Sequence, residues 1–324
     1  MFGHLSYKTK QFFFLLIKLS IVCGAFYFIY NKLTTNEALD FKVFIAYVSK
    51  NKIFSFENII ILFSLTSLNW FFEILKWKNL ASTVSKISLL DAFKQSVASL
   101  TVSLFTPNRI GEYGAKALFY TSRFRKRILL LNLMSNLSQL FTTLVFGCVG
   151  FILFYLQYDV DISLKTLFRI VTIYIVIGFS FVLGYKVTKF KYNGISVESL
   201  KVFLISIPSY IHLKTLLLSV IRYLIFSFQF FVLLRFFGID VYYYNAMLVI
   251  TSFYLLSSLV PTIFIFDVIV KGSIALYLFS FVSVNDLTIL SITTLMWLLN
   301  FVSVSCIGSV FVIQYKLPVK KNKN

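Results

Sequence analysis

The chain has 324 residues, of which 59% are hydrophobic, and its mean hydropathy is +0.86. The core of a soluble protein does not require this much apolar surface, and several apolar runs reach the roughly 20 residues that cross a bilayer. The composition predicts an all-α, polytopic membrane protein with a single integral membrane domain over residues 1–324. It argues against a β-barrel, because barrel strands give short segments of alternating polarity.

The formal net charge of +19 would suit a nucleic-acid-binding protein, but the basic residues are placed in loops between apolar runs. Such loops face anionic lipid headgroups in membrane proteins, so the predicted partner is the lipid bilayer and not a nucleic acid. The cysteines Cys23, Cys148 and Cys306 are dispersed in apolar segments. This dispersal predicts small core residues, without a metal site or a disulfide framework.

The first apolar run, residues 11–30, follows Lys8 and Lys10 and is longer than the apolar region of a signal peptide. It is therefore expected to stay as the first span. Further spans are predicted at 58–75, 128–156, 166–185, 214–237 and 288–314. Two more apolar segments, 96–121 and 245–281, are interrupted by prolines.

The loops differ in charge, and this difference predicts an orientation. Basic residues greatly outnumber acids in the N-terminal tail, in the tail after residue 314, and in the loops at 73–95, 122–127 and 186–213. Acids outnumber basic residues in the other loops, at 31–57, 157–165, 238–244 and 282–287. Because basic loops stay in the cytoplasm, we expect a multi-pass protein of the cell (inner) membrane with both termini cytoplasmic.

The first interrupted segment, 96–121, has basic loops on both sides and should enter and leave on the cytoplasmic side. It is too short for two crossings of about 20 residues each, so a re-entrant helical hairpin is predicted. The second segment, 245–281, has non-basic flanks and should begin and end outside. Two short crossings and a deep hairpin both fit it, and two crossings give about eight spans in total.

The two interrupted segments repeat one order of residues. In the first, Pro107 is followed by Glu112, and Lys116 comes four residues after the acid. The second repeats this order with Pro261, Asp267 and Lys271. Broken helices that enter from opposite faces are typical of an inverted repeat in a transporter, whose site lies where they meet.

An acid and a lysine four residues apart lie on one helix face, and a lone charge in lipid is costly. One interpretation is a neutralised structural pair that locks the hairpin, and the other is a polar site for a charged headgroup. An excess of base favours the second: the cations in the membrane zone are Arg109, Lys116, Arg222, Arg235 and Lys271, and the acids are Glu112 and Asp267. This excess predicts an anionic ligand such as a lipid phosphate, which arginine binds through its bidentate fork.

Two of these arginines have a second interpretation, because long basic side chains reach the membrane interface from helix ends. Arg235 is close to the end of the 214–237 span and is expected at the interface. Arg222 is about two turns inside, and both the interface and the interior fit it. Trp70 and Trp77 end the second span and fit an interfacial aromatic belt.

Glycines and prolines mark the predicted hinges, which are Pro107, Gly111, Gly114 and Pro261. Glycine allows a turn or a close backbone approach. Proline suits the first position of a helix, and the free N–H groups at such a helix start bind anions.

Catalytic motifs are missing from the sequence. The only histidines, His4 and His212, lie in the tail and in a predicted cytoplasmic loop, and no nucleophile–base pair, metal spacing or phosphate-binding loop accompanies them. No metal and no cofactor are therefore expected, and the chain is not expected to be an enzyme.

Three stretches of this sequence resemble motifs of one family. The stretch "TPNRIGEYGAKAL" resembles the Pro–x–x–(Ile/Leu)–Gly–Glu motif of the lysylphosphatidylglycerol synthase transmembrane-region family, the flippase-like domain, and "EILKWKNL" resembles the basic-residue–Trp element after that family's second span. The stretch "SSLVPTIFIFDVIVKG" resembles its later Pro-containing motif. There the family has a Gly-rich run and Glu, whereas this chain has Ile263, Phe264, Ile265 and then Asp267.

The resemblance implies a stand-alone translocating part without the soluble synthase domain. It implies a re-entrant site formed by Pro107, Arg109, Gly111 and Glu112, with Asp267 and Lys271 as a looser counterpart. The expected function is the binding and translocation of an anionic phospholipid or lipid-linked intermediate between leaflets. The alternatives are a membrane-embedded transferase that uses a polyprenyl-phosphate-linked sugar or a lipid headgroup, with Glu112 as base, and a scaffold that does not transport.

Overall fold

The computed structural model describes residues 41–158 except 52, 105, 107 and 108, residues 197–259 and 266–315, and positions 16, 19, 20, 23, 27 and 30. Within this part of the chain all regular secondary structure is helical. Most of the predicted span 11–30, the span 166–185, and the prolines Pro107 and Pro261 lie outside the described residues.

In the part of the chain that the structure describes, four helical segments are long and apolar enough to cross a membrane, as in a helical membrane protein. They are α3 (Phe56–Ala81), α6 (Ser122–Gln157), α9 (Ser209–Phe236) and the stretch Asp286–Gln314. The last consists of α12 (Asp286–Trp297), a π-helical turn (Leu298–Val302) and α13 (Ser303–Gln314). These four segments match the predicted spans 58–75, 128–156, 214–237 and 288–314.

Both interrupted segments form helical hairpins. The first consists of α4 (Leu89–Ser103) and α5 (Ile110–Leu118), which pack against each other, and the second of α10 (Tyr243–Leu259) and α11 (Phe266–Ser280). Helix α4 ends at Ser103 and α5 begins at Ile110, on either side of the break predicted at Pro107, whereas the break predicted at Pro261 lies outside the described residues. The first helix of the first hairpin begins earlier than residue 96, because Ser88 and Asp91 form a capping box that starts α4 at Leu89.

Several stretches that were predicted to be loops are helical. The segment 73–81 belongs to α3, the basic run 123–127 forms the first turns of α6, and the short helices α2 (Phe41–Lys50) and α8 (Val197–Ser206) lie in other predicted loops. The prediction was wrong because charge was used as a marker of loops. Helix α6 has 36 residues, roughly 54 Å at 1.5 Å per residue, so its charged start is not needed to cross a core of about 30 Å.

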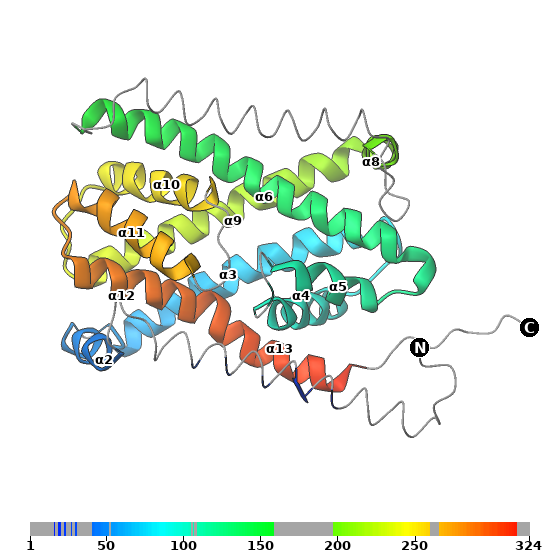
Figure 1. The fold of residues 1–324 in the computed structure, drawn as a ribbon, viewed down its shortest axis with the longest axis horizontal. Helices are drawn as coiled ribbons and strands as arrows, with labels where there is room; N and C mark the ends of the chain where they lie inside the picture. The colour runs from blue at the N-terminus through cyan, green and yellow to red at the C-terminus, as the bar shows by residue number, and fades with distance from the viewer. Residues whose placement is uncertain are drawn as a thin grey trace, which may run out of the picture.

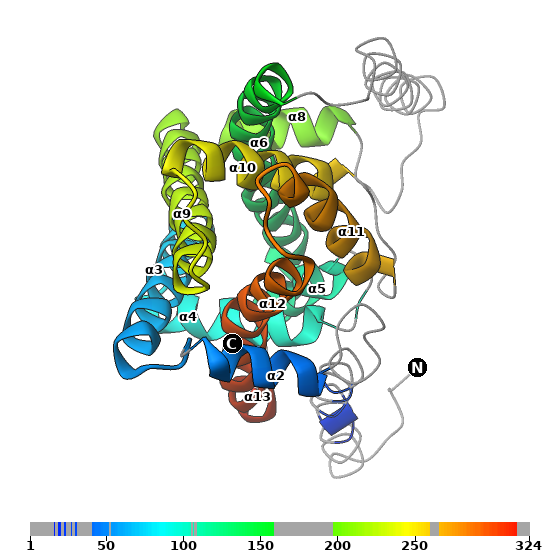
Figure 2. The same cartoon turned by 90° about the vertical axis from the view of Figure 1, so that its left-hand side faces the viewer.

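The two hairpins lie at opposite ends of the long axis of the molecule (Figure 1). Helices α3 and α9 pack along each other, and in the view along that axis they lie on one side while α11 lies on the other (Figure 2). The first helix of each hairpin packs on a long helix of the other half: α4 on α13, and α10 on α6. The halves α3–α6 and α9–α13 therefore use one packing pattern, as an internal repeat requires.

Glycines permit the two equivalent helix contacts. A Cβ atom on Gly308 of α13 would overlap the backbone of Val97 and the side chain of Thr101 in α4. A Cβ atom on Gly150 of α6 would overlap the side chain of Thr251 in α10. Small residues that let backbones approach are the usual basis of helix packing in membranes, where apolar side chains gain little by leaving lipid.

The prediction that the cysteines are core residues was wrong, because Cys23, Cys148 and Cys306 are all exposed. The outer surface of α6 also carries large exposed apolar side chains, among them Phe141, Val145 and Val149. An apolar context does not distinguish inside from outside when the surrounding solvent is lipid.

Candidate functional site

Two buried carboxylates each bind two cations. The carboxylate of Glu112 contacts Lys116 Nζ at 2.8 Å and Arg109 Nη2 at 2.9 Å, and all three residues lie at or in α5. We call these residues the α5 triad. The contacts confirm that the acid and the lysine share one helix face, and they add the arginine that precedes the helix.

A second triad links α3 and α9. The Oε2 atom of Glu73 contacts Lys76 Nζ at 2.8 Å and Arg222 Nη1 at 3.0 Å. We call these residues the α3–α9 triad. Glu73 and Lys76 were missed from the sequence because they were assigned to a loop. The available signal was an acid and a base three residues apart in the apolar stretch "FFEILKW", which places both on one face of a helix.

The lysines hold the carboxylates from inside the protein. The side chains of Lys76 and Lys116 are each only 1% exposed. Lys116 also donates to Asn132 Oδ1 at 2.8 Å and lies 4.3 Å from the centre of the Trp77 ring. A buried ion pair of this kind fixes geometry, and removing one partner leaves an uncompensated charge.

Trp70 and Trp77 do not form an interfacial belt, and that prediction was wrong. Both are buried: the indole N–H of Trp77 donates to Gln95 Oε1 at 2.8 Å, and that of Trp70 to the carbonyl of Asn300 at 3.0 Å. The physical reason is that both indole rings find hydrogen-bond partners on other helices, which makes burial favourable.

The arginines point outward from the triads, toward open space. The side chain of Arg109 is 46% exposed and that of Arg222 is 21% exposed. Arg109 precedes α5 in the left-handed region, with φ 57° and ψ 29°. This conformation costs about 1–2 kcal/mol for a residue with a Cβ atom. It directs the side chain of Arg109 back onto Glu112.

The turn before α5 needs a glycine at position 111. A Cβ atom there would lie 2.7 Å from the carbonyl oxygen of Val102 and 2.9 Å from the side chain of Thr106, whose hydroxyl accepts from the Gly111 N–H at 2.9 Å. Gly111 therefore permits the close approach of α5 to the end of α4. Gly114 lies inside α5, where a Cβ atom would meet open space.

Two cavities adjoin at the arginines. The larger has a volume of about 390 Å³ and aromatic walls, and Arg109, Arg222 and Lys271 line it without any Asp or Glu among its described residues. The smaller has a volume of about 240 Å³ and is lined mainly by polar groups, including both carboxylates of the triads. The lining residues shared by the two cavities are Trp70, Arg109, Gln139, Thr143 and Arg222.

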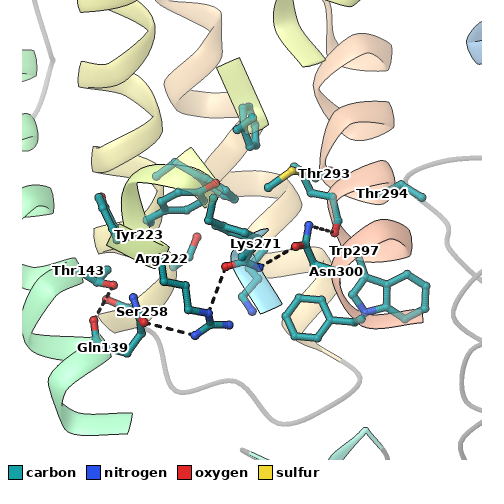
Figure 3. Close-up of a pocket in the computed structure, with 18 of the residues that line it drawn as sticks. Gln139, Thr143, Arg222, Tyr223, Ser258, Lys271, Thr293, Thr294, Trp297 and Asn300 are labelled. Carbon is teal, nitrogen blue, oxygen red and sulfur yellow. Dashed lines mark hydrogen bonds between the residues drawn. The ribbon is translucent and has the colours of Figure 1, made fainter. Parts of the chain in front are cut away.

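Arg222 is held in place by a polar network between helices. Its Nε donates to Asn69 Oδ1 at 3.1 Å and its Nη1 to Gln139 Oε1 at 3.3 Å. Asn69 donates to Asn300 Oδ1 at 2.8 Å, and Asn300 donates to Gln229 Oε1 at 2.9 Å. Figure 3 shows the Arg222 guanidinium between Gln139 and Asn300. Asn300 lies in the π-helical turn, a local distortion that is frequent at functional sites.

The structure brings most of the predicted site residues together. Arg109, Glu112 and Lys116 form one triad, Arg222 joins the other, and Lys271 lines the larger cavity with both arginines. The side chain of Asp267 lies outside the described residues. Arg235 is outside the cluster: it is half-exposed at the end of α9 and pairs with Asp240.

The cluster can bind an anion, and nothing in it resembles a metal site. In the described part of the chain, no three His, Cys, Asp or Glu residues lie close enough to hold a metal ion. The ring of His212 bonds to the carbonyl of Leu204, away from the cavities.

No protein-family model, curated protein or solved structure matches the chain.

Proposed function

We propose that the chain binds an anionic phospholipid or lipid-linked intermediate and moves it between the leaflets of the cell (inner) membrane. One observation carries this proposal: two arginines, each held by a buried carboxylate, face the shared boundary of a polar and an aromatic cavity. Guanidinium groups held in this way suit a phosphate, whose oxygens accept charge-assisted hydrogen bonds from arginine. The aromatic cavity suits the apolar part of the same molecule.

The proposed topology follows from the hairpins. Helices α4–α5 and α10–α11 lie at opposite ends of a bundle whose long helices are α3, α6, α9 and α12–α13. If the long helices cross the membrane, the first hairpin re-enters from the cytoplasmic side and the second approaches from the other side. Both termini are then cytoplasmic, with about eight spans, and the larger cavity is lined by Arg109 of the first hairpin and Lys271 of the second.

In the proposed mechanism, the phosphate leaves its leaflet and pairs with Arg109 and Arg222. Glu112 and Glu73 orient the two guanidinium groups, while Lys116 and Lys76 keep the carboxylates charged and fixed. Because both carboxylates already bind two cations, neither is placed to take a proton from a substrate. This arrangement supports translocation more than the transferase alternative, in which Glu112 would act as base.

The resemblance to the lysylphosphatidylglycerol synthase transmembrane-region family supports the same proposal. Two motif positions of "TPNRIGEYGAKAL" are Gly111 and Glu112, and Arg109 fills one of its variable positions. Gly111 permits the turn before α5, and the other two form an ion pair beside the cavities. We propose that the chain is a stand-alone relative of that translocating domain.

The test is leaflet exchange of fluorescent anionic lipids in proteoliposomes. Arg109→Gln and Arg222→Gln should each abolish most protein-dependent exchange. Neither change leaves a buried charge unpaired, because Glu112 still forms its ion pair with Lys116 and Glu73 still forms its ion pair with Lys76. Arg235→Gln is the matched control, since Arg235 pairs with Asp240 and lies outside both cavities. This variant should exchange lipid at the rate of the unmodified protein.

Exchange no faster than in protein-free vesicles, across several anionic and lipid-linked substrates, would refute translocation. If the protein is a scaffold, the arginine variants should lose stability and activity together, with no separate loss of transport.

A further inference from the structure

The two triads carry more positive charge than they need for their own stability. They contain four cations and two carboxylates, an excess of two positive charges among the residues Lys76, Arg109, Lys116, Arg222, Glu73 and Glu112. The count does not include Lys271, which also lines the larger cavity. Excess charge beside a membrane core is costly unless water or a counter-ion compensates it.

The excess is divided evenly, with one positive charge in each triad. In each triad the buried lysine neutralises the carboxylate, so the added charge is the arginine that lines both cavities. The two arginines come from different structural units, the α4–α5 hairpin and the α3–α9 pair. A ligand at the boundary of the cavities therefore meets two separate guanidinium groups rather than one.

The smaller cavity has room for a compact polar group beside the arginines. Ser96 lines this cavity and is 3% exposed, and its buried hydroxyl has no hydrogen-bond partner among the described residues. Asn136 and Gln139 line it as well. A hydroxyl without a protein partner at the wall of a cavity can donate to a group bound there.

We infer that the bound headgroup is a phosphate with two negative charges, as in a terminal phosphomonoester, rather than a phosphodiester with one. A terminal phosphate offers three oxygens, enough for both arginines and a third contact with the Ser96 hydroxyl. A phosphodiester neutralises only one of the two triads. The inference rests on the proposed function, because it names the class of lipid that the same site takes.

The experiment measures binding to the purified full-length chain through its own fluorescence. The chain has three tryptophans, and Trp70 and Trp297 both line the larger cavity. The probes are a short-chain diacylglycerol phosphomonoester, the same diacyl chains as a phosphodiester with a neutral glycerol headgroup, and inorganic phosphate. Titrations at pH 8 keep the phosphomonoester doubly charged, because its second pKa is about 6.

The phosphomonoester lipid should bind at least about tenfold more tightly than the phosphodiester lipid, since it adds one charge close to a cation in a poorly screened site. Arg109→Gln and Arg222→Gln should each weaken phosphomonoester binding by about tenfold or more and remove most of the preference. Arg235→Gln should change neither affinity.

Equal affinity for the two lipids would overturn the inference while leaving the proposed function in place, provided that leaflet exchange still requires the arginines. Inorganic phosphate that binds as tightly as the phosphomonoester lipid would assign the site to soluble phosphate and overturn the lipid part. A tenfold preference without protein-dependent exchange would support the headgroup inference and refute translocation alone.

Discussion

The replacement Glu112→Gln should destabilise the protein through Lys116, not through Arg109. The Lys116 side chain is 1% exposed, and Glu112 is the only carboxylate within ion-pair distance of it in the described part of the chain. Removing one partner of a buried pair costs about 3–5 kcal/mol, because the remaining charge stays buried. Arg109 is 46% exposed and can turn to water, so its lost contact should contribute no more than about 1 kcal/mol.

The assay is a double-mutant cycle on the free energy of unfolding in detergent. Glu112→Gln alone should cost about 3–5 kcal/mol, whereas Glu112→Gln combined with Lys116→Met should recover most of that loss, because no buried charge is then unpaired. Glu57→Gln is the control: this carboxylate lies exposed in the first turn of α3. Two results would refute the claim that Glu112 compensates the buried charge of Lys116. One is a Glu112→Gln variant whose free energy of unfolding lies within about 0.5 kcal/mol of that of the unmodified protein. The other is a double variant no more stable than the single one.

Three further predictions concern packing and the polar network. Gly308→Leu should prevent α13 from packing on α4 and abolish the monodisperse peak in size-exclusion chromatography, because a Cβ atom already overlaps the α4 backbone. Gly114→Ala should instead raise the free energy of unfolding by about 0.5–1 kcal/mol, since a Cβ atom there meets open space. Asn300→Ala removes a partner from both Asn69 and Gln229, and thermal unfolding should show a loss of about 1–3 kcal/mol.

The helices could be predicted from sequence where local patterns determine them. Four spans followed from apolar runs, and the break between α4 and α5 followed from Pro107. The α5 triad could also be predicted in large part, because Arg109, Glu112 and Lys116 lie within two turns of one helix.

The α3–α9 triad could not be predicted in this way, because Arg222 is far from Glu73 in the sequence and only the packing of α3 on α9 brings them together. The π-helical turn at Asn300 could not be predicted from the sequence either, since Asn300 makes its side-chain contacts with residues of α3 and α9, which are distant in the sequence. Burial of Trp70 and Trp77 was missed for a related reason. A belt at the interface and a contact between helices look alike in a sequence, and only the partners Asn300 and Gln95 distinguish them.

The different origins of the two arginines bear on how a ligand would move. Arg109 stands at the start of α5, on the first hairpin, whereas Arg222 is held by Glu73 and Asn69 of α3 and by Gln139 of α6. A phosphate bound to both would tie the hairpin to the long helices. If the proposed function holds, release of the ligand needs one weaker attachment, and Arg109 is the candidate, since it is the more exposed arginine and has a left-handed backbone.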